Sequence, residues 1–190
     1  MFKKRPFFNK ALKVLLISNA LIYVAGAMMG PIYALFVEEV GGNLLDASIT
    51  GGVYALAAGI VVLLSGSVSD KIKESELIVV AGYAIMALGF MMYIFVSSIA
   101  FLLIVQVVIG IGEAIMWPAF DALYSKHLDL KKRGRQWAVW EAMSYWVTAA
   151  GAIIGGVIVT FVSFDALFVI MAALCFIAAV YVLLTPRKVI

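Results

Sequence analysis

Two carboxylate side chains, Glu113 and Glu141, occur within long apolar stretches of the sequence. The interiors of these stretches contain no Lys or Arg that could pair with them. An unpaired carboxylate in an apolar interior is costly in its charged form, so it is suited to binding and releasing a proton or a cation. The alternatives are a protonated Glu113 bonded to a neighbouring backbone or hydroxyl group, and a Glu141 that reaches water from the first turn of its helix.

Polar and aromatic side chains accompany both carboxylates at helical spacing, where residues three or four apart share a face. Aromatic walls around a central carboxylate suit an organic cation or a weakly polar neutral solute, whereas ordinary packing is the alternative for the aromatic residues. An anionic solute would find no basic partner. The candidate residues for binding a proton or a small-molecule solute are Glu113, Glu141, Gln106, Trp117, Asn19, Tyr23, Tyr33, Tyr145 and Tyr54.

The composition places these residues in a membrane. Of the 190 residues, 65% are hydrophobic and only 13% are charged. Mean hydropathy is +1.11, and a soluble domain of this size would expose too much surface to hide so many apolar side chains. A single Cys and a single His can form neither an internal disulfide nor a zinc site, so we expect no metal and no cofactor.

The apolar stretches predict an all-α integral membrane protein with six transmembrane helices in one domain, residues 1–190. The third and fourth stretches, like the fifth and sixth, are separated by only two residues, which indicates antiparallel neighbours. The predicted spans are Ala11 to Val37, Ser48 to Ser69, Leu77 to Val96, Ile99 to Leu123, Trp137 to Val162, and Asp165 to Leu184.

Basic residues mark one side of the membrane. All 14 Lys and Arg lie near the amino terminus, in the second and fourth interspan loops, or at the carboxyl end, whereas the other side carries Glu38, Glu39 and Asp46. The positive-inside rule then predicts a multi-pass protein of the cytoplasmic (inner) membrane with both termini in the cytoplasm. These bases are topology signals that can also contact lipid headgroups, so we expect lipid and no nucleic acid as a partner.

The two halves of the chain register at an offset of 87 residues. The first three spans (11–96) then overlie the last three (98–184), and Met29 to Leu35 overlies Met116 to Ala122. Because the first and fourth spans run in opposite directions, the repeat is inverted, which is typical of transporters. The third and sixth spans lack polar residues between Leu77 and Val96 and between Ala166 and Leu184, so we expect them to face lipid.

Three short motifs together with this repeat resemble the major facilitator superfamily. The second interspan loop reads Gly66-Ser-Val-Ser-Asp70-Lys71, in which the Gly, the Asp and the first base match the family pattern. The fourth span reads Gln106-Val-Val-Ile-Gly-Ile-Gly112, with Gln in place of the Arg of the family's drug antiporters. The fifth span reads Gly151-Ala-Ile-Ile-Gly155-Gly156, without the antiporters' Pro.

The resemblance implies a six-helix half of a twelve-helix transporter that works by alternating access. Two parallel copies related by an axis along the membrane normal would restore the full shape, so we expect a homodimer with a solute cavity on its axis, proton-coupled through Glu113. By the same resemblance, the residues of gating and of the interface are Asp70, Gly66, Lys71, Arg135, Gly151 and Gly155. Asp70 would brace the partner's fifth span, near Arg135, although a solvated loop charge is the alternative.

Two alternatives to a homodimeric transporter are a half that does not transport and an intramembrane enzyme. A half that does not transport and needs a different partner chain, or a truncated fragment, is the alternative to a homodimeric transporter. The retained polar residues in four of the spans favour transport. An intramembrane serine protease would need a Gly-x-Ser-Gly motif and a His within a span, and neither occurs, so we do not expect an enzyme.

Overall fold

The computed structural model describes residues 7–69, 72 and 74–190. Asp70 and Lys71 lie outside these residues, so the predictions made for them stay predictions. The described chain is helical throughout, with no strand in these segments. Its elements are α1 (Lys10–Met29), η1 (Gly30–Ile32), α2 (Tyr33–Glu39), α3 (Leu44–Ser69), α4 (Ser75–Met92), η2 (Tyr93–Phe95), α5 (Ile99–His127), α6 (Arg133–Phe161) and α7 (Phe164–Leu183).

The six predicted spans are confirmed, because the described residues contain six helices long and apolar enough to cross a membrane. The helix ends lie within four residues of the predicted ones. Helix α5 runs on to His127 and α6 begins at Arg133, because a helix continues into polar residues that hydropathy does not count. Polar caps begin three of them. The side chains of Asn9, Ser98 and Ser163 accept hydrogen bonds from the backbone of α1, α5 and α7, respectively.

Proline affects the two repeats differently. Pro31 lies where the first span breaks, and the short η1 segment separates α1 from α2. Pro118 lies inside α5, which continues through it as an α-helix. A proline removes one backbone hydrogen bond and displaces the preceding turn. In the first span the α-helix ends before Pro31 and a new helix begins after η1. In the fourth span the α-helix continues through Pro118 without interruption.

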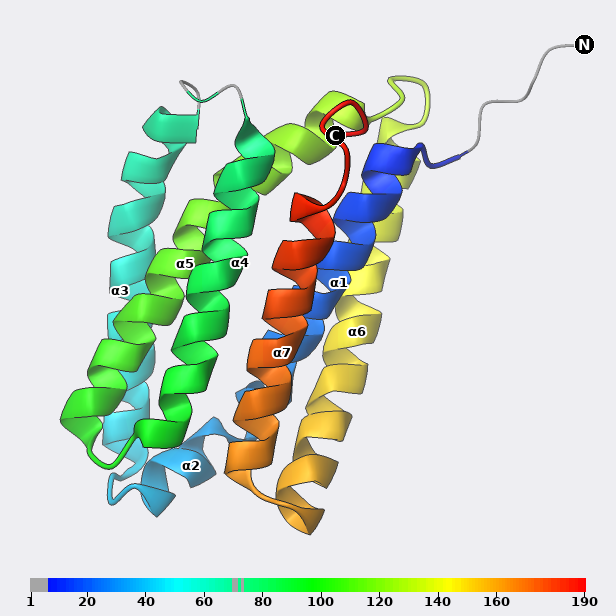
Figure 1. Cartoon of the computed structure of the whole chain (residues 1–190). Coiled ribbons are helices and arrows are strands. Elements are labelled where there is room, and N and C mark those ends of the chain that lie inside the picture. Colours follow the sequence, from blue (N-terminus) through cyan, green and yellow to red (C-terminus); the bar gives the residue numbers. More distant parts are fainter. Residues whose placement is uncertain (1–6, 70–71, 73) are drawn as a thin grey trace, which may run out of the picture.

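The helices pack as an inverted repeat requires (Figure 1). Helix α5 packs against α3 and α4, and helix α1 packs in the same way against α6 and α7. Contact between α4 and α7 joins the two groups. If α1 is exchanged with α5, α3 with α6 and α4 with α7, every one of these packed pairs maps onto another packed pair or onto itself. The first helix of each repeat therefore packs against the second and third helices of the other repeat.

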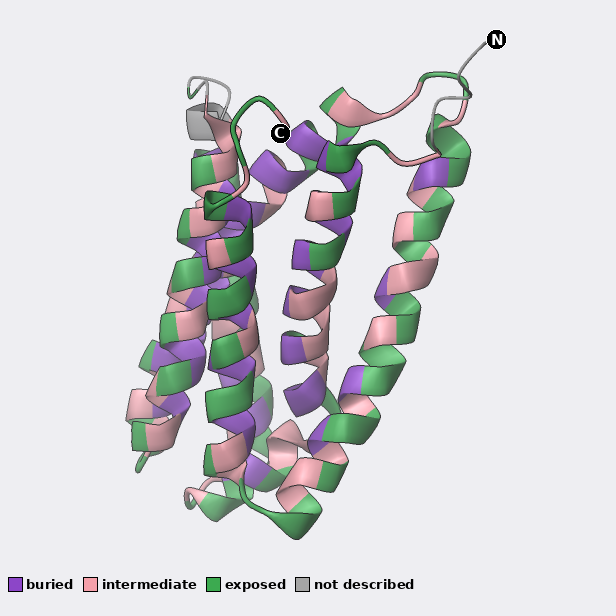
Figure 2. Ribbon diagram, turned by 45° about the vertical axis from the view of Figure 1, so that its right-hand side comes forward, coloured by how far each residue is buried: buried purple, intermediate pink, exposed green. Residues whose placement is uncertain are grey.

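Helices α4 and α7 pack side by side in front of α5 and α1 (Figure 1). The inner side of α4 buries Val79, Tyr83 and Met86, whereas its outer side exposes Leu77 and Leu88. Helix α7 likewise exposes apolar residues, among them Phe176. Each helix therefore has one packed side and one apolar outer side, and that the outer side faces lipid stays a prediction. Figure 2 shows the buried residues where helices face one another and the exposed ones on their outer sides.

Helices α3 and α6 instead form the two edges of the bundle (Figure 1). In α3 only Ala47, Thr50 and Ser65 are buried among the side chains that the structure describes. In α6 the buried residues are Gln136, Ser144, Gly151 and Gly155. The start of α1 and the carboxyl end of the chain lie at the same end of the bundle, as an even number of spans requires (Figure 1).

Close contact between α4 and α5 depends on glycine. A Cβ at Gly82 would come within 2.6 Å of the Met116 Cβ and 2.7 Å of the Gly112 carbonyl oxygen. A Cβ at Gly112 would meet the Met86 backbone nitrogen at 2.9 Å. The two backbones approach so closely because neither helix carries a side chain at the crossing, which is the usual way in which membrane helices gain packing contacts.

We expect Gly82→Ala to lower the free energy of unfolding by about 1–3 kcal/mol, because the added methyl group must push α4 away from α5. The matched control is Gly59→Ala on the exposed face of α3, where a Cβ meets nothing within 4 Å. That variant should be unchanged or slightly more stable, since alanine favours the helix. Thermal unfolding of both purified proteins in the same detergent checks this. Equal melting temperatures would contradict the close crossing.

Candidate functional site

Glu113 is the centre of a hydrogen-bonded cluster between α3 and α5. Its carboxylate accepts a hydrogen bond from the Tyr54 hydroxyl at one oxygen and from the Trp117 indole nitrogen, at 3.0 Å, at the other. Trp117 lies one turn further along α5, whereas Tyr54 reaches over from α3. Both carboxylate oxygens are thus satisfied by neutral donors.

A second polar cluster lies two turns away on the same helix. Gln106 is buried on α5 and donates from its amide nitrogen to the Tyr33 hydroxyl. Tyr33 donates in turn to the Thr50 hydroxyl, which bonds to the backbone of its own helix α3. Gln106 and Glu113 are seven positions apart, which corresponds to a distance of about 10 Å along the helix axis. This cluster ties α2, α3 and α5 together at one end of the site.

The third polar contact links α1 and α6. Trp140 donates its indole N–H to the Asn19 side-chain oxygen at 3.0 Å, and Asn19 is fully buried. The Trp140 ring packs edge-on against Tyr23 and Trp117, with ring centroids 6.3 and 6.2 Å apart. Tyr23 also meets Trp117 edge-on at 5.7 Å. An aromatic wall therefore extends from Asn19 to the indole that binds Glu113.

Two hollows meet at Glu113. One, of about 230 Å³, is bounded by Tyr23, Trp117 and Thr148, and the other, of about 320 Å³, by Tyr33, Tyr54 and Gln106. Both are also lined by Gly26 of α1. The arrangement presents one carboxylate to a space whose other walls are mainly aromatic and apolar, with Thr148 and Gln106 as further polar side chains.

Gly26 and Gly30 do not serve as close-packing surfaces, contrary to the interpretation that pairs of glycines usually suggest. Both are exposed, and a Cβ at either position would meet no atom within 4 Å. Because they carry no side chain, Gly26 leaves space on the α1 side of both hollows and Gly30 leaves space on the α1 side of the larger one. Gly151 and Gly155 do lie against α1, where a Cβ at Gly151 would approach the Val24 carbonyl oxygen at 2.8 Å.

The remaining candidate residues lie elsewhere. Glu141 and Tyr145 are exposed on α6, and the structure gives their side chains no hydrogen bond within its described part. Gly66 lies near the end of α3, with nothing within 4 Å of a Cβ. The Arg135 guanidinium carbon lies 5.5 Å from the centre of the Phe7 ring. Among the described residues no three His, Cys, Asp or Glu gather as a metal site would require.

Sequence reasoning missed Trp140, although a signal existed. Asn19 lies in an apolar stretch, so its side chain must find a partner on another helix. The four Trp of the chain each offer an indole N–H as a possible donor to it. Trp140 and Asn19 are 121 positions apart, and only the fold shows that they meet.

Comparisons with known proteins agree with this architecture. The sequence model described as Major Facilitator Superfamily matches residues 15–189. The chain is 26% identical over 178 residues to the multidrug resistance protein MdtG of Dickeya zeae (strain Ech586), which covers 92% of this chain and 43% of that protein. It is 25% identical, with the same coverage, to MdtG of Klebsiella pneumoniae (strain 342). The chain thus spans less than half the length of these curated relatives.

A solved structure shares the fold. The crystal structure of an auto-inhibited POT family peptide transporter superposes with a TM-score of 0.75 at 16% sequence identity. The match covers 95% of this chain and 38% of the other. At this identity the likeness concerns the fold alone.

Replacing Trp140 by Phe should lower the free energy of unfolding by about 1–3 kcal/mol, because the buried Asn19 oxygen loses its only donor among the described residues. The control is Trp146→Phe, which makes the same change on the exposed side of α6, where Trp146 is 72% exposed. Parallel denaturation of both variants in detergent measures the difference. If both unfold alike, the Asn19–Trp140 bond does not stabilise the protein.

Proposed function

Because the chain belongs to the major facilitator superfamily, we propose that it is a six-helix half of a secondary active transporter, and that it exports a small organic cation by alternating access in exchange for protons. The observation that carries this proposal is the state of Glu113. Its two oxygens accept bonds from neutral donors, and no Lys or Arg side chain neutralises it among the described residues.

A carboxylate in this setting attracts a positive charge. In a low-dielectric surrounding an unpaired anion is costly, and a cation that enters the hollow removes that cost. A proton and the charged group of a solute can each do so, but not both at once. Competition at one carboxylate is the simplest physical basis for exchanging protons against a cationic solute.

The walls of the hollows favour an aromatic or lipophilic cation. Tyr23, Trp117 and Trp140 form an edge-to-face cluster beside the carboxylate, and the faces of such rings attract cations when water is excluded. The names of the MdtG relatives support multidrug efflux as the broader class, although their identity to this chain is low.

A transport cavity needs a second half, and we propose a second copy of the chain, related by an axis along the membrane normal, with all termini in the cytoplasm. Support comes from the two edge helices. The exposed side of α6 carries Glu141, Tyr145 and Thr148, which are costly against lipid and suit a water-filled cavity or a protein interface. Helix α3 on the opposite edge has few buried residues but exposes apolar side chains such as Leu56, Ile60 and Leu63, so it offers a hydrophobic surface that α6 of a partner can cover.

In proteoliposomes, Glu113→Gln should abolish uptake of tetraphenylphosphonium that is driven by a proton gradient, because the amide can neither lose a proton nor pair with a cation. Uptake of the labelled cation against the imposed pH difference measures it. The control, Glu39→Gln, changes the same charge at the exposed end of α2 and should transport like the unmodified protein. Unchanged transport in Glu113→Gln would contradict proton coupling through this residue.

Cross-linking in membranes tests the partner. A variant with Leu56→Cys on α3 and Tyr145→Cys on α6 places two exposed thiols on the two edge helices, which do not pack against each other within one chain. Tyr145 lies on the same face of α6 as Glu141 and Thr148, so a short bifunctional reagent joins the two thiols only between copies. We expect a dimer band from this variant. The control pairs Leu56→Cys with Phe176→Cys on the outer side of α7, and should remain monomeric. Native Cys175 is buried in both.

The mass of particles released from lipid nanodiscs decides between the two assemblies. Two 20.5 kDa chains support the homodimer. A single chain would support the alternative, a half that needs a different partner to transport.

A further inference from the structure

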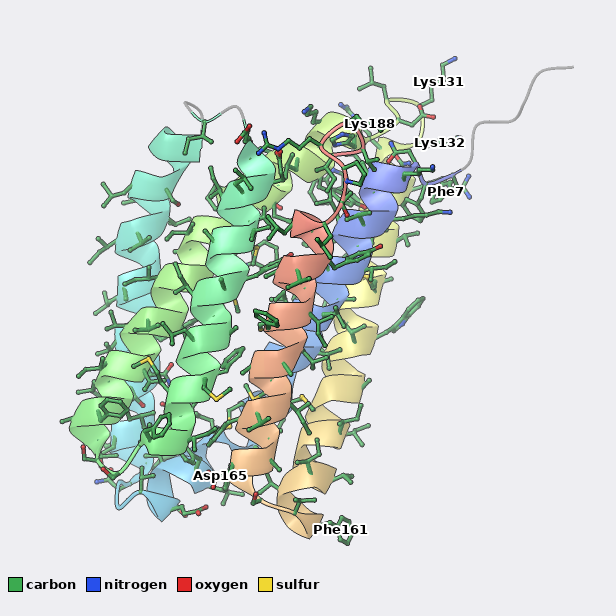
Figure 3. All side chains as sticks on the ribbon, in the orientation of Figure 1. Phe7, Lys131, Lys132, Phe161, Asp165 and Lys188 are labelled. Atoms are coloured by element: carbon green, nitrogen blue, oxygen red, sulfur yellow. The ribbon has the colours of Figure 1, made fainter. Side chains whose placement is uncertain are left out.

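A large hollow lies away from Glu113, at the end of the bundle where the segment before α1 and the α5–α6 loop meet. Its volume is about 800 Å³, and its lining residues are Phe7, Asn9, His127, Leu128, Asp129, Leu130, Lys131 and Gln136. Figure 3 shows Phe7, Lys131 and Lys132 gathered at this end, opposite Phe161 and Asp165. The transport hypothesis does not use this hollow.

A buried amide holds the walls of the hollow in place. Gln136 is 1% exposed, donates from its side-chain nitrogen to the Phe7 carbonyl oxygen at 2.6 Å, and accepts from the Asp129 backbone nitrogen at 2.9 Å. The Tyr124 hydroxyl donates to the backbone carbonyl oxygen of Gln136 at 2.9 Å. One side chain thus fixes both the segment that precedes α1 and the loop that follows α5.

Asn9 adds a second tie between the same two segments. Its side-chain oxygen caps α1, and its side-chain nitrogen donates to the His127 carbonyl oxygen at 2.8 Å. The His127 Nδ1 lies 2.8 Å from the Leu123 carbonyl oxygen, which can only accept, so this nitrogen carries the proton. The hollow is therefore a built feature rather than a gap between loose loops.

The charge around the hollow is strongly positive. Residues 7–13 and 126–135 contain seven Lys and Arg and a single acidic residue, Asp129. That carboxylate is already engaged, because it accepts from the Lys131 backbone nitrogen at 3.0 Å and pairs with the Lys132 ammonium group at 3.6 Å. Within the described residues the Lys131 ammonium group has no carboxylate partner. A ligand for this place is an anion.

The hollow is also apolar on one side. Leu130, next to Lys131, is 83% exposed, and Leu128 and Phe7 contribute further apolar surface. A bare phosphate ion would satisfy the lysine and leave the leucine in water. An amphiphile whose anionic head meets Lys131 while its chains contact Leu130 satisfies both, and the ends of the transmembrane helices are where lipid headgroups lie.

From these contacts we infer that the hollow binds the phosphodiester headgroup of an anionic phospholipid, with Lys131 on the phosphate and Leu130 against the glycerol and acyl chains. This site is separate from the solute site at Glu113, so either can fail without the other.

Native mass spectrometry of the full chain in detergent, titrated with dioleoyl phosphatidylglycerol or dioleoyl phosphatidylcholine, tests the site. We expect the unmodified protein to retain phosphatidylglycerol preferentially. K131Q should weaken that retention roughly fivefold, as about 1 kcal/mol per basic residue near a membrane surface implies. The matched control is K188Q, which removes an exposed charge at the same end of the molecule and should bind like the unmodified protein.

Two further arms identify the source of the anion. L130S should weaken retention of the dioleoyl lipid, and millimolar inorganic phosphate should not displace it. Equal retention of both lipids, equal effects of K131Q and K188Q, or displacement by inorganic phosphate would each overturn the inference.

Discussion

The bond between the Tyr54 hydroxyl and the Glu113 carboxylate is the contact on which the rest of the site depends. It crosses from α3 to α5, and it requires the two backbones to lie unusually close. Gly110 permits this, because a Cβ there would come within 2.8 Å of the Tyr54 carbonyl oxygen. The edge helix α3, which has few other buried residues, is thus positioned where its tyrosine can satisfy a carboxylate that lipid could not.

The inverted repeat accounts for the positions of two other buried polar groups, but not for the position of Glu113. Asn19 and Gln106 are 87 residues apart, so they occupy equivalent places in the two repeats, and each amide bonds to an aromatic side chain of a different helix. The position equivalent to Glu113 is Gly26. The repeat symmetry therefore holds for the two amides that join helices. It does not hold at Glu113, whose counterpart is a glycine, so that a single carboxylate borders the hollows.

Much of the fold could be predicted from the sequence because spanning a membrane imposes length and apolarity on each helix. Glu113, Tyr54 and Gln106 could be singled out for the same reason, since polar groups are rare in such helices. The pairings could not be predicted. Tyr54 bonds to Glu113 and Trp140 to Asn19 through contacts between helices that no local pattern encodes. Nor could the sequence show which side of α4 and α7 packs against the other helices, because an apolar residue fits a protein interior as well as it fits lipid.

The break at Pro31 divides the first span into two mechanical parts. Helix α1 is held by α6 and α7, whereas α2 begins with Tyr33, whose hydroxyl is bonded to Thr50 on α3 and to Gln106 on α5. The short α2 segment is therefore covalently part of the first span but is bonded to α3 and α5, while its Phe36 ring packs against Phe168 of α7 at 5.0 Å. A displacement of α1 relative to α5 would be taken up at Gly30–Ile32, and Tyr33 would keep its place beside the hollow.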